Sequence, residues 1–199
     1  MTNGSNAGDD TNGGDTNGDD TNGDTGDDMN GNGTNGDDKP VTVSVKSGRH
    51  IRFDLPLVLT TLLNPRMLRH ASNTSFLFKA NKESPENKET VVYEIAEGDT
   101  LVTLLGSLAL CDDEQYTQNP DLLILPYQGN SRLASKALSI VERLTPRAVL
   151  LDHFDDAFPP LSRNIDTAPF VKKMARRHPE IPVIVPKRGQ AIRVGFPTE

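Results

Sequence analysis

Residues 121–152, DLLILPYQGNSRLASKALSIVERLTPRAVLLD, contain the pattern that decides the fold of this chain. DLLILP is a continuous apolar run bounded by Asp121 and Pro126, which predicts a strand buried on both faces. RAVLLD (147–152) predicts a second buried strand. Between them, SRLASKALSIVERL (131–144) predicts a helix with Ser131 as its N-cap. The apolar side chains of one face of this helix are Leu133, Ala137, Ile140, Val141 and Leu144.

The flanking sequence extends this pattern in both directions. Downstream, DTAPFVKKMARRH (166–178) predicts another helix, and IPVIVP (181–186) with QAIRV (190–194) predicts β structure. Strand, helix, strand, helix and strand in succession, with short connections, indicate an α/β layer.

The upstream sequence has the alternation of β structure. VTVSV (41–45) alternates apolar and small polar residues, Ser47-Gly48 predicts a turn, and HIRFDLP (50–56) alternates again. VVYEIAEGDTLVTLLGS (91–107) predicts a hairpin with Glu97-Gly98-Asp99 at its turn. The apolar stretch between Leu57 and Leu63 has no decisive period, and its type stays open.

The first 38 residues are a low-complexity tail. They contain ten Asp, ten Gly, eight Asn and six Thr, and motifs such as TNGDD recur with imperfect spacing. The tail has almost no apolar surface to bury, so we expect it to be disordered. Its oxygen-bearing side chains are also the kind that bind Ca²⁺. However, the tail has no Glu, and it lacks the apolar residue that calcium-binding repeats place between their turns. A solvating tail is therefore the favoured interpretation.

The charge and cysteine counts limit the partners and the cellular compartment that we expect for this protein. The tail holds ten of the 28 acidic side chains and none of the 21 basic ones, so residues 39–199 carry 18 acidic against 21 basic side chains. No basic stripe with interleaved aromatic residues occurs, which disfavours nucleic acid as a partner. No long apolar stretch or signal-like amino terminus occurs, which disfavours a membrane span or secretion. A lone Cys111 fits a reducing compartment, and we expect a cytoplasmic protein whose folded domain is residues 39–199.

The best candidate site follows the second buried strand, in LLDHFDDAFPP (150–160). His153 has Asp152 before it and Asp155 and Asp156 just after it. In α/β layers, ligands bind at the carboxyl ends of strands. The carboxylates can fix the tautomer of this histidine or join it on a metal. A plain polar cluster at a strand end is the alternative.

Other chemistry-bearing residues give weaker signals. His50 opens the predicted strand 50–56, and Gly106-Ser107 follows the predicted hairpin. Ser107 lacks the flanking glycines of a nucleophile elbow, so a triad with His153 and Asp155 is a minor hypothesis. No activating base is identifiable for Cys111. We interpret two histidines as structural: His70, in a polar segment, and His178, at a helix end where a cation complements the dipole.

Several of these segments together resemble one known family. HIRFD, GSLAL, DLLILPYQG and TPRAVLLDHFDDAF, in this order, resemble the carboxyl-terminal half of metallo-β-lactamase-fold hydrolases, closest to the lactonase-like and phospholipase D-like branch. The resemblance covers roughly residues 41–195. It implies part of an αββα sandwich, with zinc or another divalent metal at one edge of the sheets. It also implies a metal-activated water that attacks an ester, a lactone or a phosphodiester.

The resemblance assigns metal positions to individual residues. His50 matches the position of the family's mid-chain histidine metal ligand, and His153 matches the position of its late histidine metal ligand. Asp155 is a candidate ligand or supporting group, and Asp156 is a further supporting candidate. Ser107 stands where many members of the family carry a bridging Asp, and a serine there weakens or removes one of two metal positions.

The chain departs from the family in one respect. The main ligand motif, HxHxDH, is absent, since no two histidines lie within five residues of each other. A catalytic zinc needs about three protein ligands and an open position, so His50 and His153 alone are not enough. Half of a sandwich also leaves an apolar sheet face without its cover. We therefore expect a homodimer, or a partner chain over that face. The alternative function is a non-catalytic remnant or protein-binding module.

Overall fold

The computed structural model describes residues 39–65, 69, 76, 79, 82–83, 88–156, 162–187 and 189–195. The chain divides into two units, Met1–Asp37 and Asp38–Glu199, and all the described residues belong to the second. The predicted tail and His70 lie outside the described residues. So do residues 157–160 of the LLDHFDDAFPP stretch.

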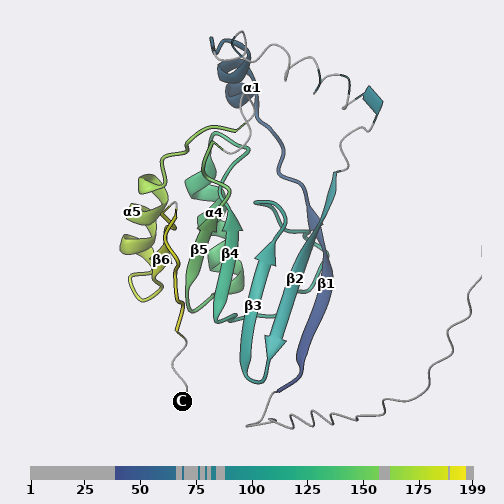
Figure 1. The fold of residues 1–199 in the computed structure, drawn as a ribbon, viewed down its shortest axis with the longest axis vertical. Coiled ribbons are helices and arrows are strands. Elements are labelled where there is room, and N and C mark those ends of the chain that lie inside the picture. The colour runs from purple at the N-terminus through teal and green to yellow at the C-terminus, as the bar shows by residue number, and fades with distance from the viewer. Residues whose placement is uncertain are drawn as a thin grey trace, which may run out of the picture. The chain divides into compact units, whose positions relative to one another are not determined.

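The described residues form a mixed α/β fold around one six-stranded sheet with the strand order β1-β2-β3-β4-β5-β6 (Figure 1). The first three strands pair antiparallel, and β3, β4, β5 and β6 pair parallel. The strands are β1 Val41–Arg49, β2 Glu89–Glu97, β3 Thr100–Leu105, β4 Leu122–Pro126, β5 Val149–Asp152 and β6 Val183–Ile184. Three helices are described: α1 Leu55–Leu62, α4 Leu133–Leu144 and α5 Ala168–Arg177. None of them is long and apolar enough to cross a membrane.

The predicted strand–helix–strand unit is confirmed. β4 and β5 are parallel neighbours, with Leu123 opposite Val149 and Leu125 opposite Leu151. All five predicted apolar residues of α4 are buried. The N-cap prediction is wrong, because α4 begins at Leu133 and the hydroxyl of Ser131 donates to the Asp54 carboxylate instead. This hydrogen bond lowers the pKa of Asp54.

The hairpin of β2 and β3 is confirmed, whereas the predicted turn at Ser47-Gly48 is wrong. Gly98 lies at the hairpin turn with φ of 58°. β1 runs without interruption to Arg49, and its register with β2 places Gly48 opposite Thr90. A Cβ on Gly48 would lie 2.9 Å from the Thr90 side chain. The glycine therefore allows close approach of two strands and makes no turn.

The predicted strand over residues 50–56 is also wrong. His50–Asp54 follow β1 as an irregular segment, and α1 begins at Leu55. Asp54 is the N-cap of this helix, since its side chain accepts a hydrogen bond from the Leu57 amide at 3.3 Å. Pro56 lies in the first turn, where proline is tolerated. The capping Asp54 and Pro56 favour a helix start over the strand that the alternation of HIRFDLP predicted. The stretch between Leu57 and Leu63, whose type the sequence left undecided, is helical up to Leu62.

The carboxyl-terminal β structure is smaller than predicted. β6 is only Val183–Ile184, paired with Val149 and Leu150. QAIRV (190–194) contains no strand. Four of its five residues are exposed, so this segment has no packed face to stabilise regular structure.

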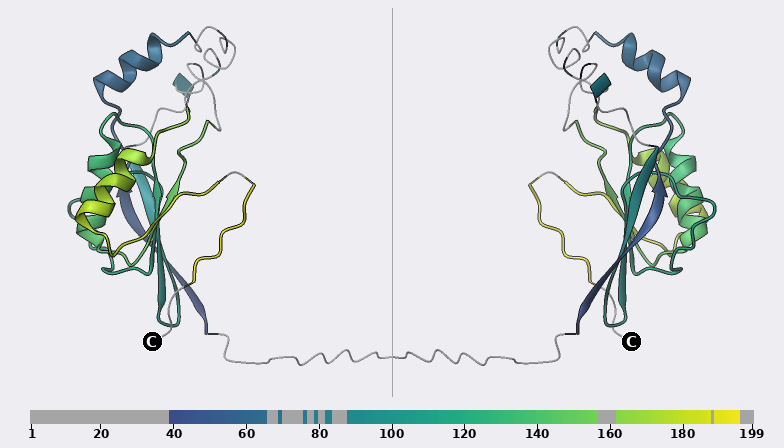
Figure 2. Two further views of the ribbon diagram at one scale, coloured as in Figure 1. Left: turned by 90° about the vertical axis from the view of Figure 1, so that its left-hand side faces the viewer. Right: turned by 90° about the vertical axis from the view of Figure 1, so that its right-hand side faces the viewer.

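The two faces of the sheet differ. Helices α4 and α5 lie on the same face (Figure 2), where they pack on buried residues of β4 and β5. Phe170 and Met174 of α5 are fully buried. On the opposite face Val41, Val43 and Val45 of β1 are exposed by 59%, 55% and 58%, and Val91 and Tyr93 of β2 are exposed as well. Among the described helices, none covers this second face.

Candidate functional site

The carboxyl ends of four strands lie at the same end of the sheet. β1 and β3 are both antiparallel to β2 and therefore run in the same direction, and β4 and β5 run parallel to β3. His50 follows β1 directly, Ser107 lies two residues after the end of β3, and His153 follows β5 directly. The sequence analysis predicted that His50 opens a strand. This prediction is wrong, because His50 directly follows the end of β1 and no strand begins there. The topology places these three predicted residues at the same end of the sheet, but β2, β3 and β4 lie between β1 and β5. At about 4.8 Å for each strand spacing, the ends of β1 and β5 are about 19 Å apart, so the sheet does not bring His50 and His153 together.

Ser107 joins the ends of β1 and β3. Its side-chain oxygen accepts a hydrogen bond from the Ile51 amide at 2.8 Å, and the residue is buried. The preceding Gly106 donates its amide to the Val91 carbonyl at 2.9 Å, and a Cβ there would lie 2.5 Å from the Thr90 hydroxyl. Among the described residues, the hydrogen bond to the Ser107 side-chain oxygen comes from a backbone amide and not from a histidine. This contact therefore positions the chain and does not activate a nucleophile.

His50 is half-buried and held in place by its neighbours. Its Nδ1 lies 3.0 Å from the Ile51 carbonyl oxygen, and its ring meets Phe53 edge-on at a centroid distance of 6.2 Å. A carbonyl only accepts, so in the neutral ring the proton lies on Nδ1 and the lone pair on Nε2. Metal-binding histidines are commonly oriented in this way.

His153 is exposed, and its backbone has a left-handed conformation with φ of 51°. Its amide donates to the Asp152 carboxylate at 2.7 Å, which stabilises the turn after β5. A non-glycine residue in this region is uncommon and is enriched at sites that require a fixed side-chain direction. The strand end therefore presents this imidazole to solvent.

The two aspartates that follow differ in their surroundings. Asp155 is exposed, and Asp156 is half-buried and accepts a hydrogen bond from the buried Ser162 at 3.4 Å. Across the described part of the chain, no group of three or more His, Cys, Asp or Glu side chains lies close enough to hold a metal ion. His50, His153 and Asp155 thus lie at the same end of the sheet but do not form a complete set of metal ligands.

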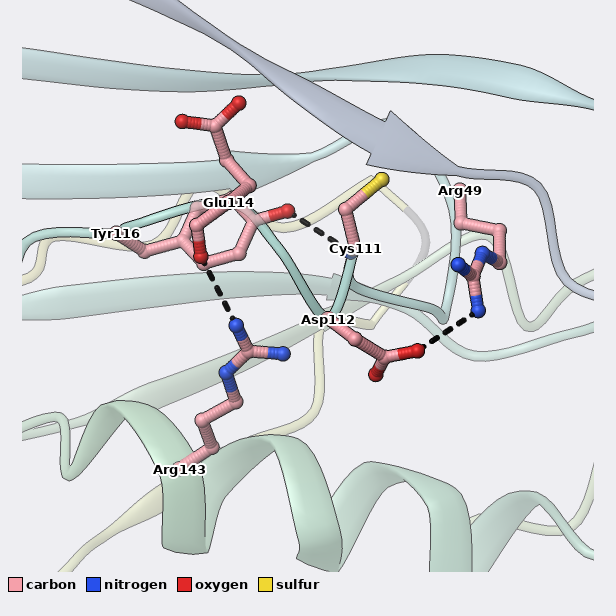
Figure 3. A network of polar contacts seen from close by, with 6 residues as sticks. All are labelled: Arg49, Cys111, Asp112, Glu114, Tyr116 and Arg143. Atoms are coloured by element: carbon pink, nitrogen blue, oxygen red, sulfur yellow. Dashed lines mark hydrogen bonds and ion pairs between the residues drawn. The ribbon is translucent and has the colours of Figure 1, made fainter.

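The structure contains a polar network that the sequence did not predict (Figure 3). The chain after β3 crosses to the free side of β1, where Leu110 bridges to Gly48. The Tyr116 hydroxyl donates to the Ser47 carbonyl at 2.6 Å and accepts from the Cys111 amide at 2.9 Å. Desolvation raises the pKa of Tyr116. Cys111 is therefore part of a structural turn.

Two arginines extend this network. The Arg143 guanidinium from α4 lies 5.2 Å from the centre of the Tyr116 ring and donates to the Glu114 carbonyl at 3.0 Å. Arg49 at the end of β1 makes an ion pair with Asp112 at 3.1 Å. Figure 3 shows Asp112 between these two arginines. Partners such as Tyr116 and Ser47 are 69 residues apart, so local patterns carry no signal for the contact.

Comparison with protein-family models, with curated proteins and with solved structures finds no match for this chain.

Proposed function

We propose that residues 39–199 are one half of a metallo-β-lactamase-type hydrolase, the half that carries the late metal ligands. The observation that supports the proposal is the common direction of β1, β3 and β5, since His50, Ser107 and His153 all follow strands that finish at the same end of the sheet. A second chain with the HxHxDH motif would then supply the other ligands and the second layer of the αββα sandwich.

In this proposal each residue has a defined role. His50 and His153 are ligands, Asp155 is a ligand or orients one, and Ser107 takes the place of a bridging carboxylate. The Ile51 carbonyl at 3.0 Å from Nδ1 orients His50 for binding through Nε2. A zinc ion bound there would supply a water of lowered pKa for attack on an ester, a lactone or a phosphodiester. The described residues alone form no complete ligand set, so no reaction step is assigned to this chain by itself.

Metal content tests this proposal. We expect the purified chain to carry zinc or iron at near one equivalent, and a chelator should remove this metal readily, because the chain holds only part of a site that needs about three protein ligands. His153→Ala should remove the metal. The measurement is metal analysis by mass spectrometry together with thermal unfolding in the presence and absence of a chelator.

The matched control is His178→Ala, which removes a histidine at the end of α5 near Glu142 and Glu180. This variant should keep the metal content of the parent protein. A metal-free protein whose unfolding temperature does not change in chelator would contradict the hydrolase proposal.

The second candidate function is a protein-binding module, and the exposed side of β1 favours it. The amide and carbonyl of Ser47 point away from β2, toward Glu114 and Tyr116. Alternate residues share this direction, so the main-chain groups of Val41, Val43 and Val45 also point away from β2. No hydrogen bond to these groups comes from the described residues. An open edge beside exposed valines is a template for another strand.

The occupant that fits this edge best is a second copy of the chain. An antiparallel pair of β1 strands with its two-fold axis at Val43 would place Val41 opposite Val45 and Val43 opposite itself. The same register would place Thr42 opposite Ser44, and it would leave Lys46 beyond the paired segment, so no like charges would meet. The valine faces of the two copies would then form one continuous apolar surface.

Light scattering coupled to size-exclusion chromatography tests the second candidate. We expect twice the chain mass of 21.7 kDa, and a monomer for Val43→Lys, because two ammonium groups would face each other at the axis. Val58→Lys changes a partly exposed valine of α1 in the same way and should leave the mass doubled. A parent protein that is monomeric at all concentrations would count against self-pairing.

A further inference from the structure

A hollow with basic walls lies between α4 and the end of β1. Its volume is about 400 Å³, and it is separate from the free edge of β1 described above. Arg49 and Arg52 line it from the end of β1 and the residues that follow, and Lys136 and Arg143 line it from α4. Lys136, Ser139 and Arg143 are three and four residues apart, so they lie on one side of the helix. The size is typical of a pocket for a small organic ligand.

The charges of this hollow are not balanced. Asp112 is the acidic residue of its lining, and this carboxylate already pairs with Arg49 at 3.1 Å. Arg52, Lys136 and Arg143 have no acidic partner among the described residues. His50 also lines the hollow and adds no negative charge. Three cations that line one hollow without a counter-ion among the described residues raise the local positive potential and favour an anion.

One of the cations is held in a fixed position. The Arg143 guanidinium donates to the Glu114 carbonyl at 3.0 Å and packs over the Tyr116 ring. One N–H is therefore used by the protein, and others remain for a ligand. Because the guanidinium is planar and already oriented, less side-chain entropy is lost when it binds a phosphate or a carboxylate. The Ser139 hydroxyl on the same side of α4 adds a neutral donor.

The base of the hollow is apolar. Four of its lining residues are buried hydrophobic side chains: Ile51, Leu108, Leu110 and Ile140. These four side chains are at most 8% exposed, so the apolar area that they leave open to the hollow is small. A ligand with a compact apolar body can cover that area, which a small inorganic ion cannot do. The hollow thus combines an apolar base with a cationic rim.

We propose that this hollow binds a small organic phosphate monoester, with its phosphate at Arg52, Lys136 and Arg143 and its apolar group over Ile140. A dianionic phosphate balances more of the excess charge than one carboxylate does, and its three terminal oxygens suit guanidinium donors. The hollow shares His50 with the proposed metal site, but binding of the phosphate requires no metal, so its test is separate from that of the hydrolase function.

Calorimetric titration of the full chain with phenylphosphonate tests the proposal. This probe has a dianionic head and an apolar ring, and its C–P bond resists hydrolysis. The titration is done in a chelator, so that binding to a metal cannot contribute. We expect saturable binding that is weakened about tenfold or more in the double variant Arg52→Gln/Lys136→Gln, since this variant removes two charge-assisted hydrogen bonds to the phosphate. Neither side chain has a partner in the described residues, so the fold is not at risk.

The matched control is Lys172→Gln/Arg176→Gln, which removes the same two charges from exposed positions of α5. This control also removes two positive charges, but away from the hollow. The control variant should bind phenylphosphonate with the same affinity as the parent protein. Equal weakening in both double variants would reveal a general charge effect and overturn the proposal, as would a lack of saturable binding. Inorganic phosphate or benzoate that binds as tightly as phenylphosphonate would show that the proposed ligand class is wrong.

Discussion

Phe170→Ala is expected to lower the free energy of unfolding by about 3–5 kcal/mol. Phe170 is fully buried, and its ring lies 5.7 Å from that of Tyr127, measured between centroids. It is one of two fully buried residues by which α5 packs on the sheet, together with Met174. Removing the ring leaves a cavity beneath the helix, and the rigid strands β4 and β5 cannot close it.

Urea unfolding followed by circular dichroism measures this change. The control is Phe76→Ala, which removes the same ring from a position that is 66% exposed. It should change the free energy of unfolding by less than about 0.5 kcal/mol. Equal values for the two variants would mean that Phe170 does not pack in the core.

Glu94→Ala is expected to lower the free energy of unfolding by about 2–4 kcal/mol, the second largest effect. Glu94 lies in the middle of β2 and is only 6% exposed. Its carboxylate accepts from the Thr117 amide at 2.7 Å, from the Thr117 hydroxyl at 2.9 Å and from the Ser44 hydroxyl at 3.4 Å. Truncation removes these charge-assisted hydrogen bonds and leaves the Thr117 amide without its acceptor.

The same unfolding experiment separates the charge from the shape of this side chain. Glu94→Gln keeps the carbonyl acceptor for the Thr117 amide, and its amide group can donate to the two hydroxyls, so the loss should be smaller. Glu97→Ala changes an exposed glutamate of the same strand and should have little effect. If Glu97→Ala costs as much as Glu94→Ala, the buried hydrogen bonds do not stabilise the fold.

Part of the candidate site was predictable from the sequence. The apolar run of RAVLLD ends at Asp152, so His153 was expected at a strand end, and the strand β5 has this boundary. Ser107 was expected after a strand, and β3 ends at Leu105. His50 was placed at the start of a strand, because the alternation of HIRFDLP resembles β structure and the cap at Asp54 was not recognised.

The metal-ligand set implied by the family resemblance remains a proposal. The resemblance rests on the order of elements and on short motifs, and these place His50 and His153 at strand ends. For His50 the sequence predicted the start of a strand, and the structure places it after the end of β1. The motifs do not place ligand atoms around a common point. In the described residues those side chains form no group of three potential ligands, so the missing partner chain is essential to the hydrolase proposal.

The sequence by itself determined the elements whose burial is periodic. In α4 the 3.6-residue period selected the five residues that are buried, and in β4 and β5 continuous apolar runs marked the strands. The predicted burial on both faces of these two strands is wrong in part, because Leu123, Leu125, Val149 and Leu151 are fully buried, whereas Ile124 and Leu150 on the other face are half-buried. These patterns are local, because a helix or a strand repeats its contacts every few residues. The tertiary structure alone decided where polar side chains meet. Glu94 bonds to a residue 23 positions away and Ser107 to one 56 positions away, and the basic hollow joins β1 to α4. Such contacts depend on the register and crossing of whole elements, which no short segment of sequence encodes.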